Sequence, residues 1–176
     1  NYQVPKGFFE SERCKRPESK RLKSGLTDIK MKIVIIKYNA GNIQSVQFAL
    51  ERIDVQARVT DDPELISAAD KVIFPGVGEA STAMNYLKER TLDELITSLK
   101  QPVLGICLGM QLMCSHSEEN NTGCLGIFEN VKVSKFNPVE TLLKVPQIGW
   151  NTIYNLKSNL FSGILENSYC YFVHGY

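Results

Sequence analysis

The sequence predicts an α/β domain built on a doubly wound, mostly parallel sheet. Short apolar segments alternate with helix-like segments between residues 32 and 115. The connections are long enough for the crossover helices that parallel strands require. A cysteine between two glycines, in Gly105-Ile106-Cys107-Leu108-Gly109, is typical of a sharp turn from a buried strand directly into a helix. Ligands of such sheets bind outside the carboxyl ends of the strands.

The elements of this sheet are expected in alternating order. The expected strands cover 32–36, 55–60, 70–74 and 103–106, and the expected helices cover 42–53, 79–90, 91–99 and 108–115, with a helical turn at Asp61-Asp62-Pro63. Asn42 is placed to cap the first helix. The apolar face of that helix is expected to consist of Ile43, Val46, Leu50 and Ile53.

The pattern changes after residue 115. Residues 118–126 form a polar segment with glycines, which predicts a loop. Residues 131–136 and 169–174 are expected to be strands of antiparallel hairpins appended to the sheet.

The composition indicates one globular domain with an extension. The chain has 176 residues, of which 43% are hydrophobic, enough for a buried core. Residues 1–30 carry eight Lys/Arg and four Asp/Glu, a balance of +4, and show no sustained period. We therefore expect a non-domain extension there, disordered or upstream sequence. Met31 precedes the first strand and is expected to be the native start, so that the domain spans 31–176.

Several classes of protein are disfavoured. Residues 31–176 hold twelve Lys/Arg and fifteen Asp/Glu, a balance of −3, which gives no reason to expect nucleic acid. No apolar run approaches the ~20 residues that cross a membrane. The five cysteines lack the paired spacing of a disulfide framework or a metal site. We expect a cytoplasmic protein with no metal, no other cofactor and no membrane contact.

Cys107 is the candidate nucleophile. A turn of this kind holds the sulfur at the edge of the sheet, where a thiolate attacks a carbonyl; the alternative is a buried structural cysteine. The backbone N–H of Leu108 is one expected oxyanion donor. The second is expected from Pro75-Gly76-Val77-Gly78, with the Val77 N–H as first choice because glycines flank it. An ordinary strand-to-helix turn is the alternative for that loop.

Two histidines are candidates for the general base. His116 follows Cys107 by nine residues, about 13 Å along the expected helix at 1.5 Å per residue, which is too far from the sulfur. His174 ends an apolar segment. From chemistry alone, it is as well suited to act as the base as to form structural hydrogen bonds.

Five stretches resemble known families. Gly105-Ile106-Cys107-Leu108-Gly109-Met110-Gln111 and Pro75-Gly76-Val77-Gly78 resemble the class I, or triad-type, glutamine amidotransferases, whose fold is flavodoxin-like. Three further stretches resemble the glutaminase subunits of imidazole glycerol phosphate synthase, of histidine biosynthesis: Tyr38-Asn39-Ala40-Gly41-Asn42, Pro146-Gln147-Ile148-Gly149-Trp150-Asn151 and Tyr171-Phe172-Val173-His174-Gly175-Tyr176. The resemblance covers essentially all of 31–176 and none of 1–30.

The resemblance implies a reaction and a partner. Cys107 of a Cys-His-Glu triad would attack the side-chain amide of glutamine, and water would hydrolyse the thioester after ammonia leaves. Gln111 would help to hold the glutamine. The ammonia would pass to a separate (β/α)₈-barrel cyclase subunit, which forms imidazole glycerol phosphate and an aminoimidazole carboxamide ribotide. Four residues match motifs that face the cyclase in the heterodimer: Asn42, Gln147, Trp150 and Asn151.

The sequence departs from the family at its end. The family's triad His and Glu lie in a later His-Pro-Glu motif that no residue here matches, and His174 belongs to the earlier Phe-Val-His motif. We therefore expect C-terminal strands to be missing and the chain as given to be inactive. Two alternatives stay open: another class I glutaminase, for example that of vitamin B6 synthesis, or a catalytically dead fragment that only docks onto a partner.

Overall fold

A computed structural model describes residues 31–39, 42–138 and 144–176; the expected extension, 1–30, lies outside the described residues. The strands are β1 (Ile33–Ile36), β2 (Ala57–Thr60), β3 (Lys71–Phe74), β4 (Val103–Gly105), β5 (Cys114–Ser117), β6 (Thr122–Gly123), β7 (Phe128–Val133), β8 (Gln147–Thr152) and β9 (Tyr169–His174). The helices are α1 (Ile43–Glu51), α2 (Pro63–Ser67), α3 (Ala80–Glu89), α4 (Leu92–Ser98) and α5 (Leu108–Leu112), with 3₁₀ turns η1 (Glu119–Asn121) and η2 (Asn159–Phe161).

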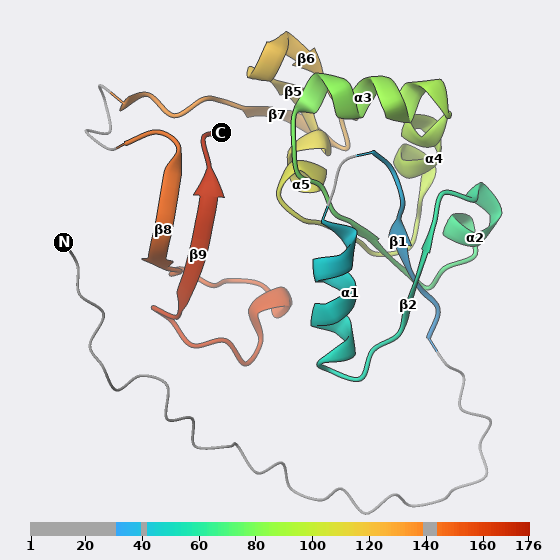
Figure 1. The fold of residues 1–176 in the computed structure, drawn as a ribbon, viewed down its shortest axis with the longest axis horizontal. Helices are drawn as coiled ribbons and strands as arrows, with labels where there is room; N and C mark the ends of the chain where they lie inside the picture. The colour runs from blue at the N-terminus through green and yellow to red at the C-terminus, as the bar shows by residue number, and fades with distance from the viewer. Residues whose placement is uncertain (1–30, 40–41, 139–143) are drawn as a thin grey trace, which may run out of the picture. The chain divides into compact units, whose positions relative to one another are not determined.

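The first four strands form one parallel sheet in the order β2-β1-β3-β4 (Figure 1). The order reverses direction after β1, because β2 lies on one side of it and β3 on the other. This is the doubly wound arrangement that the alternating pattern predicts, and each predicted strand is present within two residues of its expected ends. The carboxyl ends of β3 and β4 therefore lie side by side, and the site is built there.

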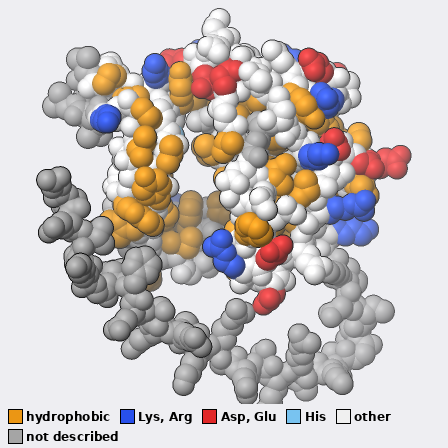
Figure 2. Space-filling view, in the orientation of Figure 1, with side chains coloured by type: hydrophobic (Ala, Val, Ile, Leu, Met, Phe, Trp, Pro, Cys, Tyr) orange, Lys and Arg blue, Asp and Glu red, His pale blue; other side chains and the backbone are white. Residues whose placement is uncertain are grey.

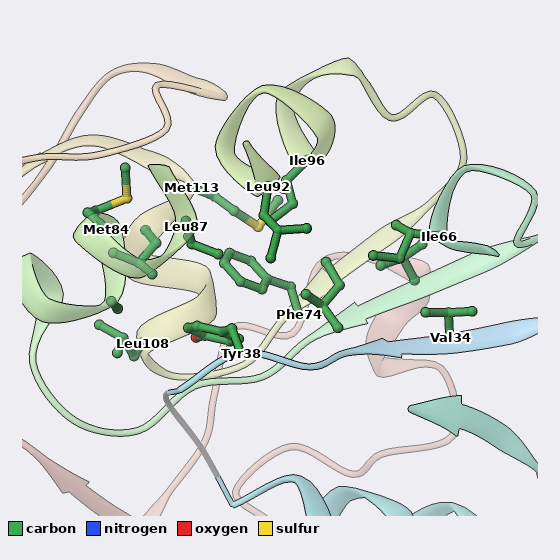
Figure 3. Close-up of a cluster of buried hydrophobic side chains, with 14 of the residues drawn as sticks. Val34, Tyr38, Ile66, Phe74, Met84, Leu87, Leu92, Ile96, Leu108 and Met113 are labelled. Atoms are coloured by element: carbon green, nitrogen blue, oxygen red, sulfur yellow. The ribbon is translucent and has the colours of Figure 1, made fainter. Parts of the chain in front are cut away.

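One face of this sheet carries the core. Val34 and Ile36 of β1 and Val72 and Phe74 of β3 point to the same side, as alternate residues of strands do. They pack against the helices α2 to α5, and the side chains labelled in Figure 3 show this cluster. Phe74 is fully buried. The core thus fixes the strand from which the Pro75–Gly78 loop emerges.

The opposite face of the sheet is less completely covered. Helix α1 begins after Asn42, whose side chain accepts a hydrogen bond from the Ser45 N–H at 3.2 Å, so the predicted cap is confirmed. None of the residues of α1 is fully buried, and the predicted apolar face fails at Ile53, which lies beyond the helix and is 65% exposed. Leu104 of β4 is also exposed on this side.

The helix predicted over 108–115 is shorter than expected. It ends at Leu112, and Cys114–Ser117 forms β5, which pairs in parallel with β7 and antiparallel with β6. The apolar helical period stops at Leu112, and the backbone groups of the next residues find partners in neighbouring strands. His116 therefore lies on a strand, and the distance argument made for it from a long helix is wrong.

The later strands also differ from expectation. The strand predicted over 131–136 runs from Phe128 to Val133 and joins β5 in parallel rather than forming a hairpin. Residues 118–126, predicted as loop, contain η1 and β6. The strand predicted over 169–174 is β9, and its partner β8 was not predicted as a strand. β8 and β9 form a separate antiparallel hairpin.

One face of the β8–β9 hairpin is apolar and open. Ile148 pairs with Val173, and Trp150 pairs with Tyr171, so that all four side chains share a face. Each is more than half exposed, and Figure 2 shows hydrophobic side chains gathered over this hairpin. Helices of the described residues are all too short or too polar to cross a membrane.

Candidate functional site

Cys107 lies in the turn between β4 and α5. Its backbone has φ 52° and ψ −116°, a conformation that non-glycine residues rarely adopt, and its thiol is exposed. Residues held in such sparsely populated conformations cluster at active sites, where the surrounding structure enforces them. The strand–turn–helix context predicted from Gly-x-Cys-x-Gly is therefore present, and Cys107 is not a buried structural cysteine.

The second glycine of this motif permits the close packing that holds the turn. A Cβ added to Gly109 would overlap the carbonyl oxygen of Phe74 and lie 2.8 Å from its carbonyl carbon. The Ile106 N–H also donates to that Phe74 oxygen at 3.0 Å. The end of β3 and the first turn of α5 thus touch backbone to backbone, which only a residue without a side chain allows.

The Pro75–Gly78 loop lies directly beside this turn. The Leu108 N–H, one of the two expected oxyanion donors, donates to the Gly76 carbonyl oxygen at 3.2 Å. In this arrangement a loop carbonyl therefore occupies the place where an oxyanion would bind Leu108. Val77 is half exposed, and its N–H is the other expected donor. Opening the Leu108 N–H requires the Gly76–Val77 peptide to rotate.

A cavity of about 560 Å³ opens in front of the Cys107 thiol. Its lining comes from the Pro75–Gly78 loop, the Cys107 turn with α5, η1, and the β8–β9 hairpin with the segment before it. The lining residues are Val77, Gly78, Cys107, Leu108, Gln111, Glu119, Lys135, Val145, Pro146, Val173, His174, Gly175 and Tyr176. The structure thus brings together Val77, Gly78, Cys107, Leu108 and Gln111, and Gly76 of the same loop is buried and does not line the cavity. This volume lies within the range of small-molecule sites.

Glu119 is a residue of this cavity that sequence reasoning missed. It lies in η1, and its carboxylate accepts a hydrogen bond from the Ala80 N–H at the start of α3, at 2.8 Å. The next residue, Asn120, donates from its side-chain amide to the Glu79 carboxylate at 2.9 Å. These two bonds fold the polar segment back onto α3 and bring a negative charge to the cavity. No local pattern marks it, because a loop of polar residues gives no sign of where it packs.

His174 lines the same cavity as Cys107, whereas His116 does not. The His174 ring stacks edge-on against Phe136 with centroids 4.9 Å apart, and its Nδ1 lies 2.9 Å from the Tyr176 carbonyl oxygen. Within the described residues, no hydrogen bond joins either histidine to the Cys107 sulfur.

The residues expected to face a partner do not share one surface of the hairpin. Trp150 is 69% exposed and stacks edge-on with Tyr171, with ring centroids 5.5 Å apart. Gln147 and Asn151 alternate with it along β8 and therefore point to the opposite face. Asn42 caps α1 and lies apart from all three in the chain.

The residues that the structure describes contain no assembled metal site. No group of three or more His, Cys, Asp or Glu side chains is placed there to hold an ion. The chemistry available at the cavity is that of an exposed thiol beside backbone N–H groups, with one carboxylate and one lysine at the margin.

Comparisons with known proteins agree with this geometry. The family model "Glutamine amidotransferase class-I" matches residues 26–176. The imidazole glycerol phosphate synthase subunit HisH of Bacteroides fragilis ATCC 25285 is 60% identical over 146 residues, which are 83% of this chain and 74% of that protein. HisH of Bacteroides thetaiotaomicron is 58% identical over 83% of this chain and 74% of its own length. HisH of Idiomarina loihiensis is 44% identical over 83% of this chain and 72% of its own length.

Proposed function

Because the chain belongs to the class I glutamine amidotransferases, and within them to the HisH subunits of imidazole glycerol phosphate synthase, we propose that its cavity binds glutamine and that Cys107 attacks the side-chain amide. The observation that carries this proposal is the exposed thiol on a strained strand-to-helix turn, opening onto a cavity of about 560 Å³. An exposed thiol in such a turn is placed to act as a nucleophile.

The proposed reaction splits amide hydrolysis into two steps. The Cys107 sulfur bonds to the amide carbon and the carbonyl oxygen becomes an oxyanion. The proton lost by the thiol passes to the amide nitrogen, and the carbon–nitrogen bond breaks to release ammonia. Water then attacks the thioester carbon and frees glutamate and the thiol. The Leu108 and Val77 N–H groups are the proposed donors to the oxyanion in both steps. Because Leu108 donates to Gly76 here, the reaction needs the Gly76–Val77 peptide to rotate first.

The remaining polar groups of the cavity suit the other end of glutamine. The Glu119 carboxylate is the proposed partner of the substrate ammonium, and the Gln111 side chain is a proposed substrate contact. Opposite charges attract, and a charge-assisted hydrogen bond is stronger than a neutral one, so this pair favours an amino acid over a simple amide. The base that accepts the Cys107 proton is proposed to be neither His116 nor His174. Residues 1–176 with the cyclase are then expected to release no ammonia above background.

The ammonia is proposed to pass to the cyclase subunit, which uses it to form imidazole glycerol phosphate and an aminoimidazole carboxamide ribotide in the cytoplasm. Trp150 is the proposed anchor on the apolar face of the hairpin, and Gln147, Asn151 and Asn42 are proposed contacts outside that face. The alternative of a glutaminase of vitamin B6 synthesis is not favoured, because the relatives compared above carry HisH names. A fragment that only docks is the remaining alternative.

The direct test is glutamine hydrolysis by the natural full-length subunit in complex with its cyclase. Cys107→Ala is expected to lower kcat by at least ~10⁴-fold, since loss of a nucleophile removes the covalent route. Cys170→Ala, a matched change on β9 outside the cavity, is expected to stay within about twofold, as surface changes away from special features do. Hydrolysis that survives in Cys107→Ala would refute the proposal.

The same assay tests the base. His174→Gln is expected to retain kcat within about fivefold, because its ring is proposed to act only as part of the cavity wall. A loss on the order of 10³-fold, with a pH profile that loses its lower limb, would instead assign His174 as the base.

A further inference from the structure

We propose that Tyr38 is a positioning residue for the glutaminase reaction, which holds the Pro75–Gly78 loop so that only the peptide after Gly76 is free to turn. The inference rests on the proposed function of Cys107. Tyr38 follows β1, and its phenol donates a hydrogen bond to the Pro75 carbonyl oxygen at 2.6 Å. The phenol thus reaches from the end of one strand to the first residue after the neighbouring strand.

The ring of Tyr38 is fixed by the core. It is 5% exposed and packs at a tilt of 40° against Phe74, with ring centroids 5.3 Å apart. Tyr38, Phe74 and Leu108 belong to one cluster, and Figure 3 shows them near one another at its edge. A phenol anchored in this way is a rigid donor, so it holds the Pro75 carbonyl in one direction.

Fixing this carbonyl fixes the Pro75–Gly76 peptide plane. A peptide is rigid, and its N–H points away from its C=O, so the Tyr38 bond sets the direction of both groups. The next peptide is free of this bond, and its Gly76 carbonyl is the one that occupies the Leu108 N–H at 3.2 Å. Rotation is then confined to the Gly76–Val77 peptide. That rotation frees Leu108 and turns the Val77 N–H toward the cavity.

The Tyr38 phenol is the hydrogen-bond donor to Pro75 among the described residues. Pro75 and Gly76 are buried, and among the described residues no other hydrogen bond reaches the Pro75 carbonyl. A buried carbonyl without a donor is unfavourable, so losing the phenol favours turning this carbonyl toward solvent. The space is also tight, because a Cβ added to Gly76 would collide with the Tyr38 hydroxyl.

The phenol keeps its proton over the working range of pH. Burial, and in second place the charge of a Cys107 thiolate, raise the pKa of Tyr38 well above its usual value of 10.0. The hydrogen bond to Pro75 is therefore present whether Cys107 is protonated or ionised.

The test compares Tyr38→Phe with Tyr86→Phe in the natural full-length subunit bound to its cyclase. Phenylalanine keeps the ring and removes only the donor. Tyr86, half-buried on α3 under Arg90, gives the same chemical change away from the cavity. Each sample is purified as the folded complex by size-exclusion chromatography, and alkylation by iodoacetamide is followed on the peptide that carries Cys107, because the chain has other free cysteines. Alkylation of Cys107 forms no oxyanion, so its rate reports the reactivity of the thiol independently of the oxyanion donors in the Pro75–Gly78 loop.

Tyr38→Phe is expected to lower kcat about tenfold, the effect of one lost hydrogen bond in the reacting arrangement, with the KM for glutamine and the alkylation rate each changed less than about twofold. Tyr86→Phe is expected to leave all three within about twofold. A Tyr38→Phe kcat within twofold of the wild type would overturn the proposal, as would an alkylation rate that falls in step with kcat. If the wild-type complex itself fails to hydrolyse glutamine, the proposed function fails instead.

Discussion

The parallel sheet and the β8–β9 hairpin contribute to one cavity, yet they are stabilised in different ways. Every fully buried hydrophobic side chain among the described residues belongs to 34–133, and none belongs to the hairpin segment 144–176. The sheet therefore carries its own core, whereas the hairpin keeps an apolar face open, with Trp150 69% exposed. A two-stranded ribbon alone is at best marginally stable in water.

This difference divides the site into two parts. The thiol, its strained turn and the Pro75–Gly78 loop are held by the sheet and its helices. The outer wall, from Val173 to Tyr176, is held by the hairpin, which a backbone hydrogen bond from the Phe136 N–H to the Gly175 carbonyl at 3.0 Å ties to the chain before it. Changes that disrupt the packing of the sheet should therefore lower activity and stability together, whereas changes in the hairpin should separate the two.

The largest effect is expected where the sheet and α5 touch. Gly109→Ala puts a methyl group onto the Phe74 carbonyl, so either the turn or the strand has to move. We expect the free energy of unfolding to fall by about 3 kcal/mol, the upper range for overpacking, and glutamine hydrolysis to be lost. Denaturant unfolding and the ammonia assay measure the two effects.

Gly123→Ala is the matched control for this change. A Cβ added at Gly123 on β6 meets nothing within 4 Å, and this glycine has no positive φ. We expect it to change the free energy of unfolding by less than about 0.5 kcal/mol. Equal stabilities of the two variants would show that the close contact at Gly109 relaxes easily and that the turn is not held by the core.

The second-largest effect is expected at Glu119, in the lining of the cavity to which the sheet and the hairpin both contribute. Glu119→Gln removes the proposed charge partner of the substrate ammonium and keeps the shape of the side chain. We expect the KM for glutamine to rise about 100-fold with a much smaller change in kcat, because charge-assisted hydrogen bonds are the strong ones. Glu118→Gln changes the neighbouring glutamate, which is outside the cavity lining, and should leave KM within about twofold. A KM unchanged in Glu119→Gln would remove Glu119 from the proposed substrate contacts.

The sheet and the Cys107 turn were predictable because their sequence signals are local. Apolar strands alternate with helical periods, and Gly-x-Cys-x-Gly indicates the strand-to-helix turn at Cys107 by the backbone geometry of five residues. The N-cap at Asn42 is local as well. The end of α5 was not predictable, because Cys114–Ser117 has no strand pattern of its own and becomes a strand by pairing with β7.

The groups missed at the site depend on contacts between distant residues. Glu119 reaches the cavity because its turn bonds to Ala80, 39 positions earlier in the chain. Tyr38 reaches the loop through a bond to Pro75, 37 positions later. Neither residue belongs to a short motif whose spacing reports these bonds. Sequence therefore locates the exposed cysteine and its turn, and the structure adds the groups proposed to orient the loop and charge the cavity.

The third effect belongs to the hairpin alone. Trp150→Ala removes the largest exposed side chain of its apolar face, and with it the stacking on Tyr171. If this face docks on the cyclase, the Kd of the complex is expected to rise about 30-fold, as for a buried aromatic anchor, while the free energy of unfolding changes by less than about 0.5 kcal/mol. Calorimetric titration measures the Kd.

Two further variants show whether the face, rather than exposure alone, matters. Tyr154→Ala removes a side chain that is 73% exposed and lies beyond the end of β8, and we expect its Kd to stay within about twofold. Asn151→Ala changes the opposite face of the same strand. A Kd that responds to Asn151→Ala and not to Trp150→Ala would place the partner on the other side of the hairpin.

The smallest effect is a pH dependence at the start of α3. Hydrogen bonds from the Thr82 and Ser81 side chains, then from their backbone N–H groups, lower the pKa of the Glu79 carboxyl from 4.5 to about 2. A carboxyl whose pKa is lower in the folded state stabilises the fold above pH 4.5, and this contribution is lost as the pH falls toward 2. Glu79→Gln should therefore have a lower free energy of unfolding than the wild type at pH 6, and this free energy should fall less on acidification.

Glu129→Gln is the control, an exposed change on β7 without such bonds among those described. Its free energy of unfolding, measured with denaturant between pH 6 and 2, should depend on pH as that of the wild type does. Parallel curves for Glu79→Gln and the wild type would show that the ionised Glu79 carboxylate adds no pH-dependent stability.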